Sequence, residues 1–509
     1  MKLSGFTGLV LVYCMCGCAG IKAQTWSLAL TDSAQVVARV TGSPSENEQL
    51  PDPNKTFKNY VIETTDLGIM WETNRQEIMM AFGDNFGKGL TFWKSNALAI
   101  SGDKEPADGI SFSSMVMNKD SVQELIVAGK KKGQTEGQAG YEHTCIPTAG
   151  VCIGNRQFIN FMSIHKWQLG GDNDQWLINF SEIAYSDDYG KTWTRSGTQW
   201  RGDGKFAQTS YLKKDGYLYM FGTPAGRYGN IFLSRVEEDK ILDKASYSYW
   251  NGSDWLKGNE NLAEPVAYGA TGEMSVCYNE KENKFLLTYL SVTRRAIVYR
   301  EADQVTGDWS GEKVLVEDKG NAVYAPAFHP WFSSGKELYF AVSHAHPIWN
   351  IFLYRANFVS VKGKADLIAE GGFEDFPVEK LSYRSQWKFN PGATATADAH
   401  SGKIACQFKG TASSAADTII AQKIAVQPQH KYILTGWVKS NLNDRDFTIG
   451  VKGDKAQDEM YMKQKAGMNW TKFEQLIEAG INNVMDIFFT GGNSAGFTII
   501  LDDIELKSF

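Results

Sequence analysis

Two apolar runs, Leu67-Gly-Ile-Met-Trp71 and Ile78-Met-Met-Ala-Phe82, flank a short polar segment at residues 72–76. Short apolar runs on either side of a polar turn are typical of a β-hairpin. The same pattern of run, turn and run recurs four more times along the chain. The further pairs are 150–153 with 158–164, 208–212 with 217–221, 274–278 with 285–289, and 325–328 with 338–342.

A third apolar run follows most copies of this repeat, at residues 231–235, 296–300 and 351–355. A spacing of about 40–70 residues per unit is typical of the four-stranded blades of a β-propeller. Long stretches with helical periodicity are nearly absent, which indicates an all-β fold. The five copies therefore predict a five-bladed propeller over residues 24–358.

The segment Ser186-Asp-Asp-Tyr-Gly-Lys-Thr-Trp193 matches S-x-D-x-G-x-T-W, the Asp-box hairpin of many propellers. In that motif the aspartate side chain stabilises a tight turn, and the glycine adopts backbone angles that other residues avoid. We therefore expect a structural role for Asp188 and do not count it as catalytic.

The sequence changes character after residue 358, where a linker (359–370) precedes a compact unit at 371–509. This unit opens with Gly371-Gly-Phe-Glu-Asp375 and closes with Leu501-Asp-Asp-Ile-Glu-Leu506. It resembles the β-sandwich (jelly-roll) carbohydrate-binding modules of secreted glycoside hydrolases. In such modules an opening glutamate and a closing aspartate often bind a structural Ca²⁺, which makes Glu374 and Asp502 candidate ligands. Sandwiches without a sugar-binding role also occur. Candidate sugar-stacking residues are Trp387, Trp437 and Tyr461.

The first 23 residues have the features of a secretory signal: basic Lys2, an apolar run over 8–14, and small residues ending at Ala23. The apolar run is too short to span a membrane. Cys18 lies in a segment that loosely resembles a lipobox, so a lipid anchor and ordinary cleavage remain open. Either way we expect an exported bacterial protein that is periplasmic, secreted or an outer-surface lipoprotein.

The charge and composition of the chain indicate which classes of binding partner are unexpected. The net charge of −6 and the lack of a Lys/Arg block make nucleic acid and anionic membranes unexpected partners. After the signal segment the cysteines are Cys145, Cys152, Cys277 and Cys406, which lack metal-ligand spacing. A hairpin disulfide between Cys145 and Cys152 and buried free thiols are both open.

Two aspartates flank the first hairpin, with Asp66 before its first strand and Asp84 after its second. Antiparallel strands bring these two ends together, so both side chains can lie on one rim. A carboxylate pair is what glycoside hydrolysis requires, although both could be ordinary turn residues. A further acid, Glu273, precedes the inner strand of the fourth hairpin and is expected to face the central cavity.

Other polar and aromatic residues occupy comparable positions near strand ends. The residues His344 and His346 form an H-x-H pair that could bind zinc, but no third ligand is evident. Contacts with sugar hydroxyls are the preferred interpretation, and purely structural roles are the alternative. The candidates are Asn96, His165, Trp167, Arg227, His329, His344 and His346.

Several ordered motifs over about residues 35–358 resemble one family, the bacterial endo-D-arabinofuranosidases (endo-D-arabinanases), which are inverting propeller hydrolases. The motifs are Thr65-Asp-Leu-Gly68, Ala81-Phe-Gly-Asp84, Trp93-Lys-Ser-Asn96, Phe221-Gly-Thr-Pro-Ala-Gly-Arg227 and Gly272-Glu-Met-Ser-Val276.

This resemblance implies action on D-arabinan of mycobacterial arabinogalactan and lipoarabinomannan, with no cofactor required for catalysis. It makes Asp66 and Asp84 the catalytic pair, and we assign Asp66 as general base and Asp84 as general acid. Inversion predicts carboxyl groups about 6.5–9.5 Å apart.

Two alternatives remain open at this point. One is a non-catalytic glycan-binding propeller at the cell surface. The other is a hydrolase of a different furanoside such as L-arabinan, because variable loops set substrate choice on a shared fold.

Overall fold

The computed structural model describes residues 26–130, 133–138, 140–168, 175–374, 386–389, 392–409, 420–455, 460–491 and 496–509. The predicted signal at residues 1–23 lies outside this part of the chain. Within it, no helix is both long and apolar enough to cross a bilayer. Helical structure there is limited to α1 (Thr56–Tyr60) and the 3-10 turns Lys88–Leu90, Pro106–Asp108, Glu238–Lys240, Lys244–Ser246 and Glu260–Leu262.

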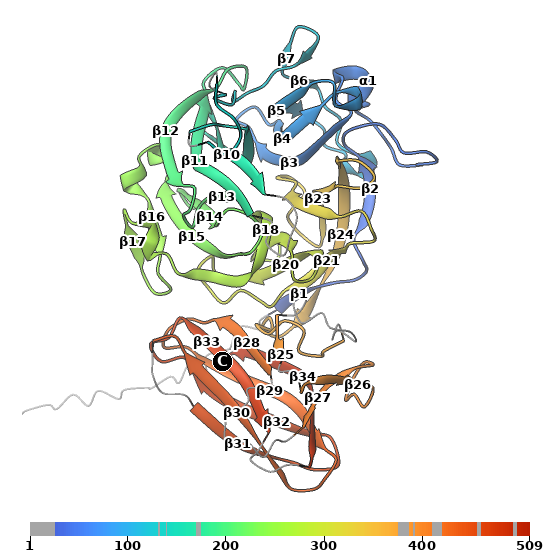
Figure 1. Cartoon of the computed structure of the whole chain (residues 1–509), viewed down its shortest axis with the longest axis vertical. Helices are drawn as coiled ribbons and strands as arrows, with labels where there is room; N and C mark the ends of the chain where they lie inside the picture. The colour runs from blue at the N-terminus through green and yellow to red at the C-terminus, as the bar shows by residue number, and fades with distance from the viewer. Residues whose placement is uncertain are drawn as a thin grey trace, which may run out of the picture.

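The larger part of the molecule consists of antiparallel sheets arranged around a common centre (Figure 1). The first sheet contains β3 (Thr64–Glu72), β4 (Ile78–Phe86), β5 (Trp93–Ser101) and β6 (Ser114–Met115), and beside it β7 (Met117–Asn118) pairs with β8 (Ser121–Val122). The second contains β9 (Thr144–Ile153), β10 (Arg156–Gln168), β11 (Gln175–Ser186) and β12 (Thr194–Arg201).

Two further strand groups are hydrogen-bonded into one larger sheet through β15 and β18. Its strands are β13 (Gln208–Lys214), β14 (Tyr217–Thr223), β15 (Gly229–Glu237), β16 (Ser248–Trp250), β17 (Trp255–Lys257), β18 (Pro265–Asn279), β19 (Lys284–Ser291), β20 (Ala296–Ala302) and β21 (Lys313–Glu317). The last group contains β22 (Val323–Phe328), β23 (Glu337–His344) and β24 (Asn350–Lys362), completed by β1 (Trp26–Leu30) and β2 (Gln35–Arg39).

The inner strands form a closed ring of contacts. Strand β3 contacts β9, β9 contacts β13, β13 contacts β18, β18 contacts β22, and β22 returns to β3. The N-terminal strands pair with β24, so the start of the described chain completes the last sheet. The five hairpins predicted from the sequence are confirmed as the antiparallel pairs β3–β4, β9–β10, β13–β14, β18–β19 and β22–β23.

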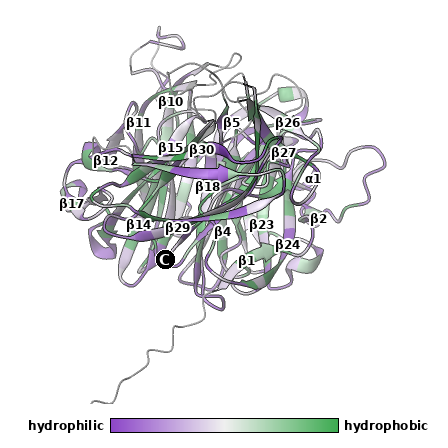
Figure 2. Ribbon diagram, turned by 90° about the horizontal axis from the view of Figure 1, so that it is seen from below, coloured by the Kyte–Doolittle hydropathy of each residue, from purple (hydrophilic) through white to green (hydrophobic). Residues whose placement is uncertain are grey.

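Apolar side chains hold neighbouring sheets together. In one core, Met80 and Phe82 of β4 pack with Ile351 and Leu353 of β24. Full burial of a side chain of this size stabilises the fold by about 1.5–3 kcal/mol. Figure 2 shows hydrophobic residues, in green, along the strands.

The Asp-box has the structural role predicted for it. The Asp188 carboxylate accepts hydrogen bonds from the Thr192 backbone N–H (2.8 Å) and the Thr192 hydroxyl (2.6 Å). Gly190 adopts a φ of +83°, and its carbonyl accepts a 3.0 Å hydrogen bond from the Trp193 indole. Asp188 therefore fixes a turn between β11 and β12.

All four cysteines in the described part of the chain are free and buried. Cys145 and Cys152 lie on the same strand, β9, where they face Ser163 and Gln157 of β10 rather than each other. The structure therefore contradicts a hairpin disulfide, and the free-thiol alternative holds.

The C-terminal part contains two five-stranded antiparallel sheets that share one apolar core. One sheet has the strands β25 (Lys388–Phe389), β28 (Ile420–Ala425), β33 (Val484–Gly491), β30 (Arg445–Gly453) and β31 (Met460–Ala466). The other has β26 (Thr394–Thr396), β27 (Ala405–Lys409), β34 (Thr498–Ser508), β29 (Lys431–Ser440) and β32 (Thr471–Glu478).

Polar contacts join the two parts. The Tyr432 hydroxyl donates to the Asp308 carboxylate (2.9 Å), and the Asn483 amide donates to the Asn251 carbonyl (2.9 Å). These contacts attach the C-terminal sheets to the third and fourth strand groups of the ring.

Candidate active site

A cavity of about 510 Å³ opens where the inner strands of the ring begin. The predicted catalytic pair, Asp66 on β3 and Asp84 on β4, lines it together with Glu273 on β18, the third candidate active-site acid. The topology thus brings together residues more than 200 positions apart in the sequence.

The first hairpin presents its two aspartates side by side. Asp66 faces Gly83 in the β3–β4 register, and Asp84 follows directly. A Cβ atom at Gly83 would lie 2.7 Å from Oδ1 of Asp66, so glycine leaves the room that this carboxylate occupies. Leu67 has a φ of +72° beside a shift in the strand register, and such strained backbone is often found at functional sites.

The Asp66 carboxyl is in an environment that favours its protonated form. Burial raises its pKa to about 7, and the nearby negative charge of Asp84 acts in the same direction. The Tyr324 hydroxyl opposes this effect by donating a 2.8 Å hydrogen bond to Oδ2. Asp66 can therefore carry a proton near neutral pH.

Two hydrogen-bond donors stabilise the ionised form of Asp84. Oδ1 accepts hydrogen bonds from the Trp93 indole (2.8 Å) and the Thr144 hydroxyl (2.7 Å). Burial raises the pKa of Asp84 to about 6, while these two donors and the charge of Lys130 lower it. Asp84 accepts two hydrogen bonds and Asp66 accepts one, which favours Asp84 as the ionised base and Asp66 as the proton donor, the reverse of the roles assigned from the sequence.

The third acid, Glu273, forms an ion pair with Arg227, which was predicted to contact the sugar. Arg227 donates to Oε1 of Glu273 from Nη2 (2.7 Å) and Nε (3.1 Å). Its guanidinium group also lies over the rings of Trp176 (5.5 Å) and Tyr324 (5.2 Å), which fix its position. The other carboxylate oxygen of Glu273, Oε2, is buried and has no hydrogen-bond partner among the described residues.

Aromatic residues border the cavity. Trp167 lines it and packs edge-on against Trp176, with ring centroids 5.4 Å apart. Trp349 and Tyr228 also line it, with 44% and 38% of their surface exposed. Exposed flat rings beside a cavity that contains three acids are suited to the apolar faces of sugars.

Comparison with protein families assigns the part of the chain that forms this cavity. Residues 52–356 match the family model described as a domain of unknown function (DUF4185). The chain belongs to the DUF4185 family. Residues 365–493 match a second model, described as a carbohydrate binding domain.

Individual relatives of this DUF4185 chain are distant. Notoamide biosynthesis cluster protein J of Aspergillus sp. (strain MF297-2) is 30% identical, over 61% of this chain and 88% of that protein. A solved structure of a putative hydrolase from Bacteroides ovatus ATCC 8483 has a TM-score of 0.42 at 13% identity, covering 59% of this chain and 87% of that chain. An exo-beta-1,3-galactanase from Phanerochaete chrysosporium has a TM-score of 0.38 at 11% identity, covering 93% and 100%.

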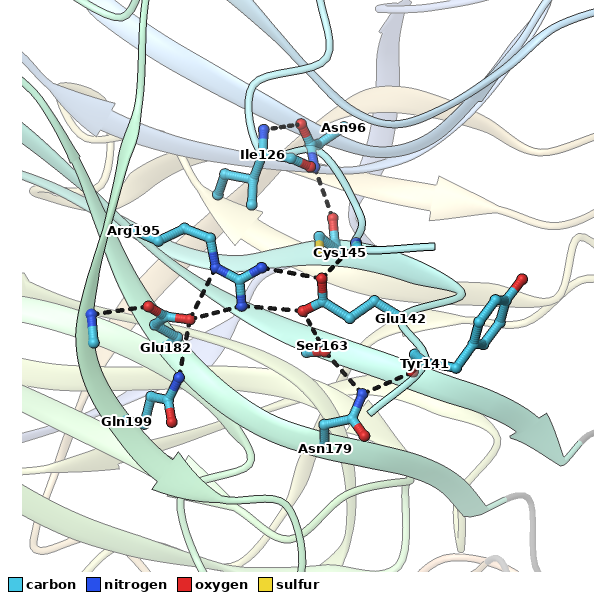
Figure 3. Close-up of polar contacts among 12 residues, drawn as sticks. Asn96, Ile126, Tyr141, Glu142, Cys145, Ser163, Asn179, Glu182, Arg195 and Gln199 are labelled. Carbon is cyan, nitrogen blue, oxygen red and sulfur yellow. Dashed lines mark hydrogen bonds and ion pairs between the residues drawn. The ribbon is translucent and has the colours of Figure 1, made fainter. Parts of the chain in front are cut away.

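Asn96 does not lie in the cavity of this DUF4185 chain, so its assignment as a substrate ligand was wrong. It is 1% exposed, and its amide nitrogen donates to the carbonyls of Ile126 (2.9 Å) and Cys145 (2.8 Å). Its amide oxygen accepts from the N–H groups of Leu125 (2.7 Å) and Ile126 (3.0 Å). Figure 3 shows the Asn96 amide with Ile126, which precedes β9, and with Cys145 on β9, so Asn96 joins β5 of the first sheet to the second.

His329 and His344 are also structural. His329 is 1% exposed and packs on Phe332 at 4.6 Å, and burial lowers its pKa to about 3. His344 is within hydrogen-bond distance of the Tyr354 hydroxyl (2.7 Å), and burial lowers its pKa to about 4. Neither ring lines the cavity.

The other two candidate histidines also lie outside the site. His165 and His346 are absent from the cavity lining, and the His346 side chain is exposed. The described residues contain no cluster of three or more His, Cys, Asp or Glu that could hold a metal. The structure therefore does not support a zinc site at His344 and His346.

The proposed calcium ligands instead hold a loop. Oε1 of Glu374 accepts from the N–H groups of Lys403 (2.8 Å) and Ile404 (3.1 Å). Oδ2 of Asp502 accepts from the N–H groups of His400 (2.7 Å) and Ser401 (3.1 Å). These contacts give both carboxylates a role in holding the loop at residues 400–404, and the described residues contain no cluster of three or more acids, histidines or cysteines around them that could hold a metal ion.

The stacking candidates of the C-terminal part differ in exposure. Trp387 is 1% exposed and belongs to the core, so it was wrongly proposed as a sugar contact. The Trp437 ring is covered by His400, with ring centroids 3.8 Å apart. Tyr461 is 51% exposed on β31 and remains accessible to a ligand.

Sequence reasoning missed the partners of the carboxylates. Tyr324 and Thr144 come from strands far along the chain from Asp66 and Asp84, and no local pattern marks them. Trp93 begins the motif Trp93-Lys-Ser-Asn96, but the sequence did not predict its hydrogen bond to Asp84. Gln208, which lines the cavity from β13, was also missed.

Proposed function

We propose that this protein is a glycoside hydrolase that cleaves internal α-D-arabinofuranosyl linkages of D-arabinan with inversion. The observation that carries the proposal is the pair Asp66 and Asp84, two carboxyls of raised pKa on one hairpin in one cavity. The choice of D-arabinan, the polymer of mycobacterial arabinogalactan and lipoarabinomannan, rests on the ordered motifs that resemble the endo-D-arabinanases.

The two carboxyls would divide the chemistry by their protonation states. Asp66, whose pKa is raised to about 7 by burial, donates its proton to the glycosidic oxygen as the bond to the anomeric carbon breaks. Asp84 is ionised and takes a proton from the water that attacks that carbon from the opposite face. One product then carries the Asp66 proton, and Asp84 holds the proton from water until solvent resets both groups.

Glu273 and Arg227 contribute charge at the same site. The negative charge of Glu273 helps to raise the pKa of Asp66, and Arg227 limits the rise. Because Arg227 neutralises Glu273 through a 2.7 Å ion pair, the cavity can hold three acids without excessive repulsion. Glu273 is proposed as an active-site residue that orients substrate rather than transfers the proton.

The rest of the chain fits a polysaccharide substrate. The closed ring of inner strands supports a five-bladed propeller as the catalytic domain. The carbohydrate-binding match over residues 365–493 supports a sugar-binding role for the C-terminal sandwich. Export through the segment 1–23, by cleavage or lipid anchoring, would bring the enzyme to a polymer outside the cytoplasm.

Incubation of the full chain with D-arabinan and with L-arabinan, followed by sizing of the products, tests the function. Short D-arabino-oligosaccharides of inverted anomeric configuration support it. Cleavage of L-arabinan alone would assign a different furanoside, and binding without cleavage would indicate a lectin. Asp66→Asn and Asp84→Asn should each lower turnover at least about 100-fold.

A matched control is available in the same chain. Asp203 is an exposed aspartate whose ion pair with Arg201 lies outside the cavity lining. Asp203→Asn should keep the wild-type rate, which separates the loss of an active-site carboxyl from a general effect of Asp-to-Asn replacement. Wild-type rates in both Asp66→Asn and Asp84→Asn would exclude the proposed pair.

A further inference from the structure

Gln208 is a buried amide that the fold does not use. It lies at the start of β13, is 2% exposed and lines the cavity. Neither its amide nitrogen nor its amide oxygen has a hydrogen-bond partner among the described residues. Its neighbour Thr209, by contrast, is within 3.1 Å of the Thr148 hydroxyl, so the local strand geometry does not prevent polar pairing.

A buried amide without partners destabilises a folded protein, because it has lost its hydrogen bonds to water. A buried group of this kind in a native fold calls for a specific explanation, and a bound partner that supplies the missing hydrogen bonds is one. The free Oε2 of Glu273 is in the same condition and lines the same cavity. Three unpaired polar atoms thus belong to two residues of one cavity.

These two residues come from inner strands on the other side of the ring from β3. Gln208 is on β13 and Glu273 on β18, and these inner strands contact each other. Asp66 and Asp84 are on β3 and β4, and β3 is separated from β13 by β9 and from β18 by β22. A sugar ring held by Gln208 and Glu273 would therefore be positioned between them and the carboxyls that act on its linkage.

We propose that the Gln208 amide and Oε2 of Glu273 bind adjacent hydroxyl groups of the sugar ring at the cleaved linkage. The proposal rests on the hydrolase function above and identifies where that enzyme recognises its substrate. The amide offers both donors and an acceptor, and the carboxylate offers an acceptor, which together match the donor and acceptor pattern of a vicinal diol. Gln208 is accordingly a specificity residue rather than a catalytic one.

The test uses Gln208→Met, which keeps the length of the side chain and removes its polar atoms. Because the amide has no partner in the fold, this variant should keep or raise the Tm of the wild type. Loss of two hydrogen bonds to substrate should lower kcat/KM on D-arabinan roughly 10- to 100-fold. A 2-deoxy or 3-deoxy arabinofuranoside should lose less in the variant than in the wild type.

Gln157→Met is the matched control. Gln157 is also buried, but its amide accepts from the Trp71 indole (2.9 Å) and donates to Cys152 Sγ (3.1 Å), away from the cavity lining. This variant should lower Tm and leave KM unchanged. The expected result is an unchanged or raised Tm with a lowered kcat/KM in Gln208→Met, and a lowered Tm with an unchanged KM in Gln157→Met.

The outcomes separate this proposal from the proposed function. Wild-type turnover of D-arabinan with unchanged kcat/KM in Gln208→Met would overturn the hydroxyl site and leave the hydrolase function standing. A lowered Tm in Gln208→Met with unchanged KM would also overturn the site, because it would indicate a structural role. Absence of turnover by the wild type on D-arabinan would overturn the function and this site with it.

Discussion

The Tyr324 hydroxyl donates a 2.8 Å hydrogen bond to Oδ2 of Asp66, across the contact between β22 and β3. A donor to a carboxylate stabilises the ionised form and lowers the pKa of the group. Tyr324 thus limits the increase that burial causes, and the pKa of Asp66 comes to about 7. Because the ring of strands is closed, Tyr324 on the last hairpin can influence the protonation of Asp66 on the first.

Replacement of Tyr324 by Phe should move the alkaline limb of the pH–rate profile to higher pH. Without the hydroxyl, the pKa of Asp66 rises, and a proton donor stays protonated further into the alkaline range. The measurement is kcat/KM on D-arabinan from pH 4 to pH 9. A limb that moves to lower pH, or does not move, would argue against Asp66 as the acid.

The control for this experiment is Tyr354→Phe. The Tyr354 hydroxyl is also within hydrogen-bond distance of a buried polar side chain, that of His344, but Tyr354 lies outside the cavity lining. Its replacement should alter stability without moving either limb of the pH profile.

Asp66→Asn should stabilise the protein more at pH 8 than at pH 4. The pKa of Asp66 is about 7 in the folded protein and near the ordinary 3.8 in the unfolded chain. Below pH 4 both states bind the proton, so ionisation has no effect on stability. Between pH 4 and pH 7 only the unfolded chain ionises readily, so the wild type loses stability as pH rises.

Asparagine cannot ionise, so the difference in Tm between Asp66→Asn and the wild type should grow over that pH window and level off above it. Thermal unfolding of both proteins at pH 4, 6 and 8 measures the difference. A constant difference would show that the pKa of Asp66 is not raised in the folded state.

Asn96→Ala should destabilise the fold without altering substrate affinity. The four hydrogen bonds of its amide satisfy backbone groups of residues 125, 126 and 145, which would be left unpaired. The expected loss is about 3 kcal/mol in the free energy of unfolding. Urea denaturation measures it, and a raised KM with unchanged stability would restore Asn96 as a substrate ligand.

The sequence predicted those features that repeat or lie close together along the chain. Short apolar runs around polar turns specify hairpins locally, so all five inner hairpins could be found. Asp66 and Asp84 could be placed close together because one hairpin carries both. By contrast, the partners Tyr324 and Thr144 reach the site only through the closure of the ring.

Buried polar residues account for the errors. Asn96 and His344 stand near strand ends, as substrate ligands do, yet backbone groups and Tyr354 occupy their polar atoms. Whether an amide or imidazole faces a cavity or a neighbouring sheet depends on contacts between sheets, which a single sequence does not reveal. Gln208 was missed for the same reason, because the sequence does not reveal that this amide lines the cavity.

Trp349→Ala should weaken binding of polymer more than cleavage of short oligosaccharides. Trp349 lies at the rim near β3, where its carbonyl accepts a 3.2 Å hydrogen bond from the N–H of Thr65, next to Asp66. Tyr228 lies at the rim between β14 and β15. Trp349 belongs to the strand group next to β3, and Tyr228 belongs to the group of β13 across the ring, so a polymer segment that contacts both rings would cross the cavity.

Loss of one stacking contact should raise KM for D-arabinan roughly 3- to 10-fold and shift products toward longer oligosaccharides. Trp26→Ala is the matched control, since Trp26 is also 44% exposed but lies on β1, outside the cavity lining. Equal effects of Trp349→Ala on polymer and on short oligosaccharides would contradict a chain that crosses the rim. An effect on polymer alone, absent in Trp26→Ala, would support endo cleavage, because only a chain that extends past the catalytic carboxyls can contact the rim.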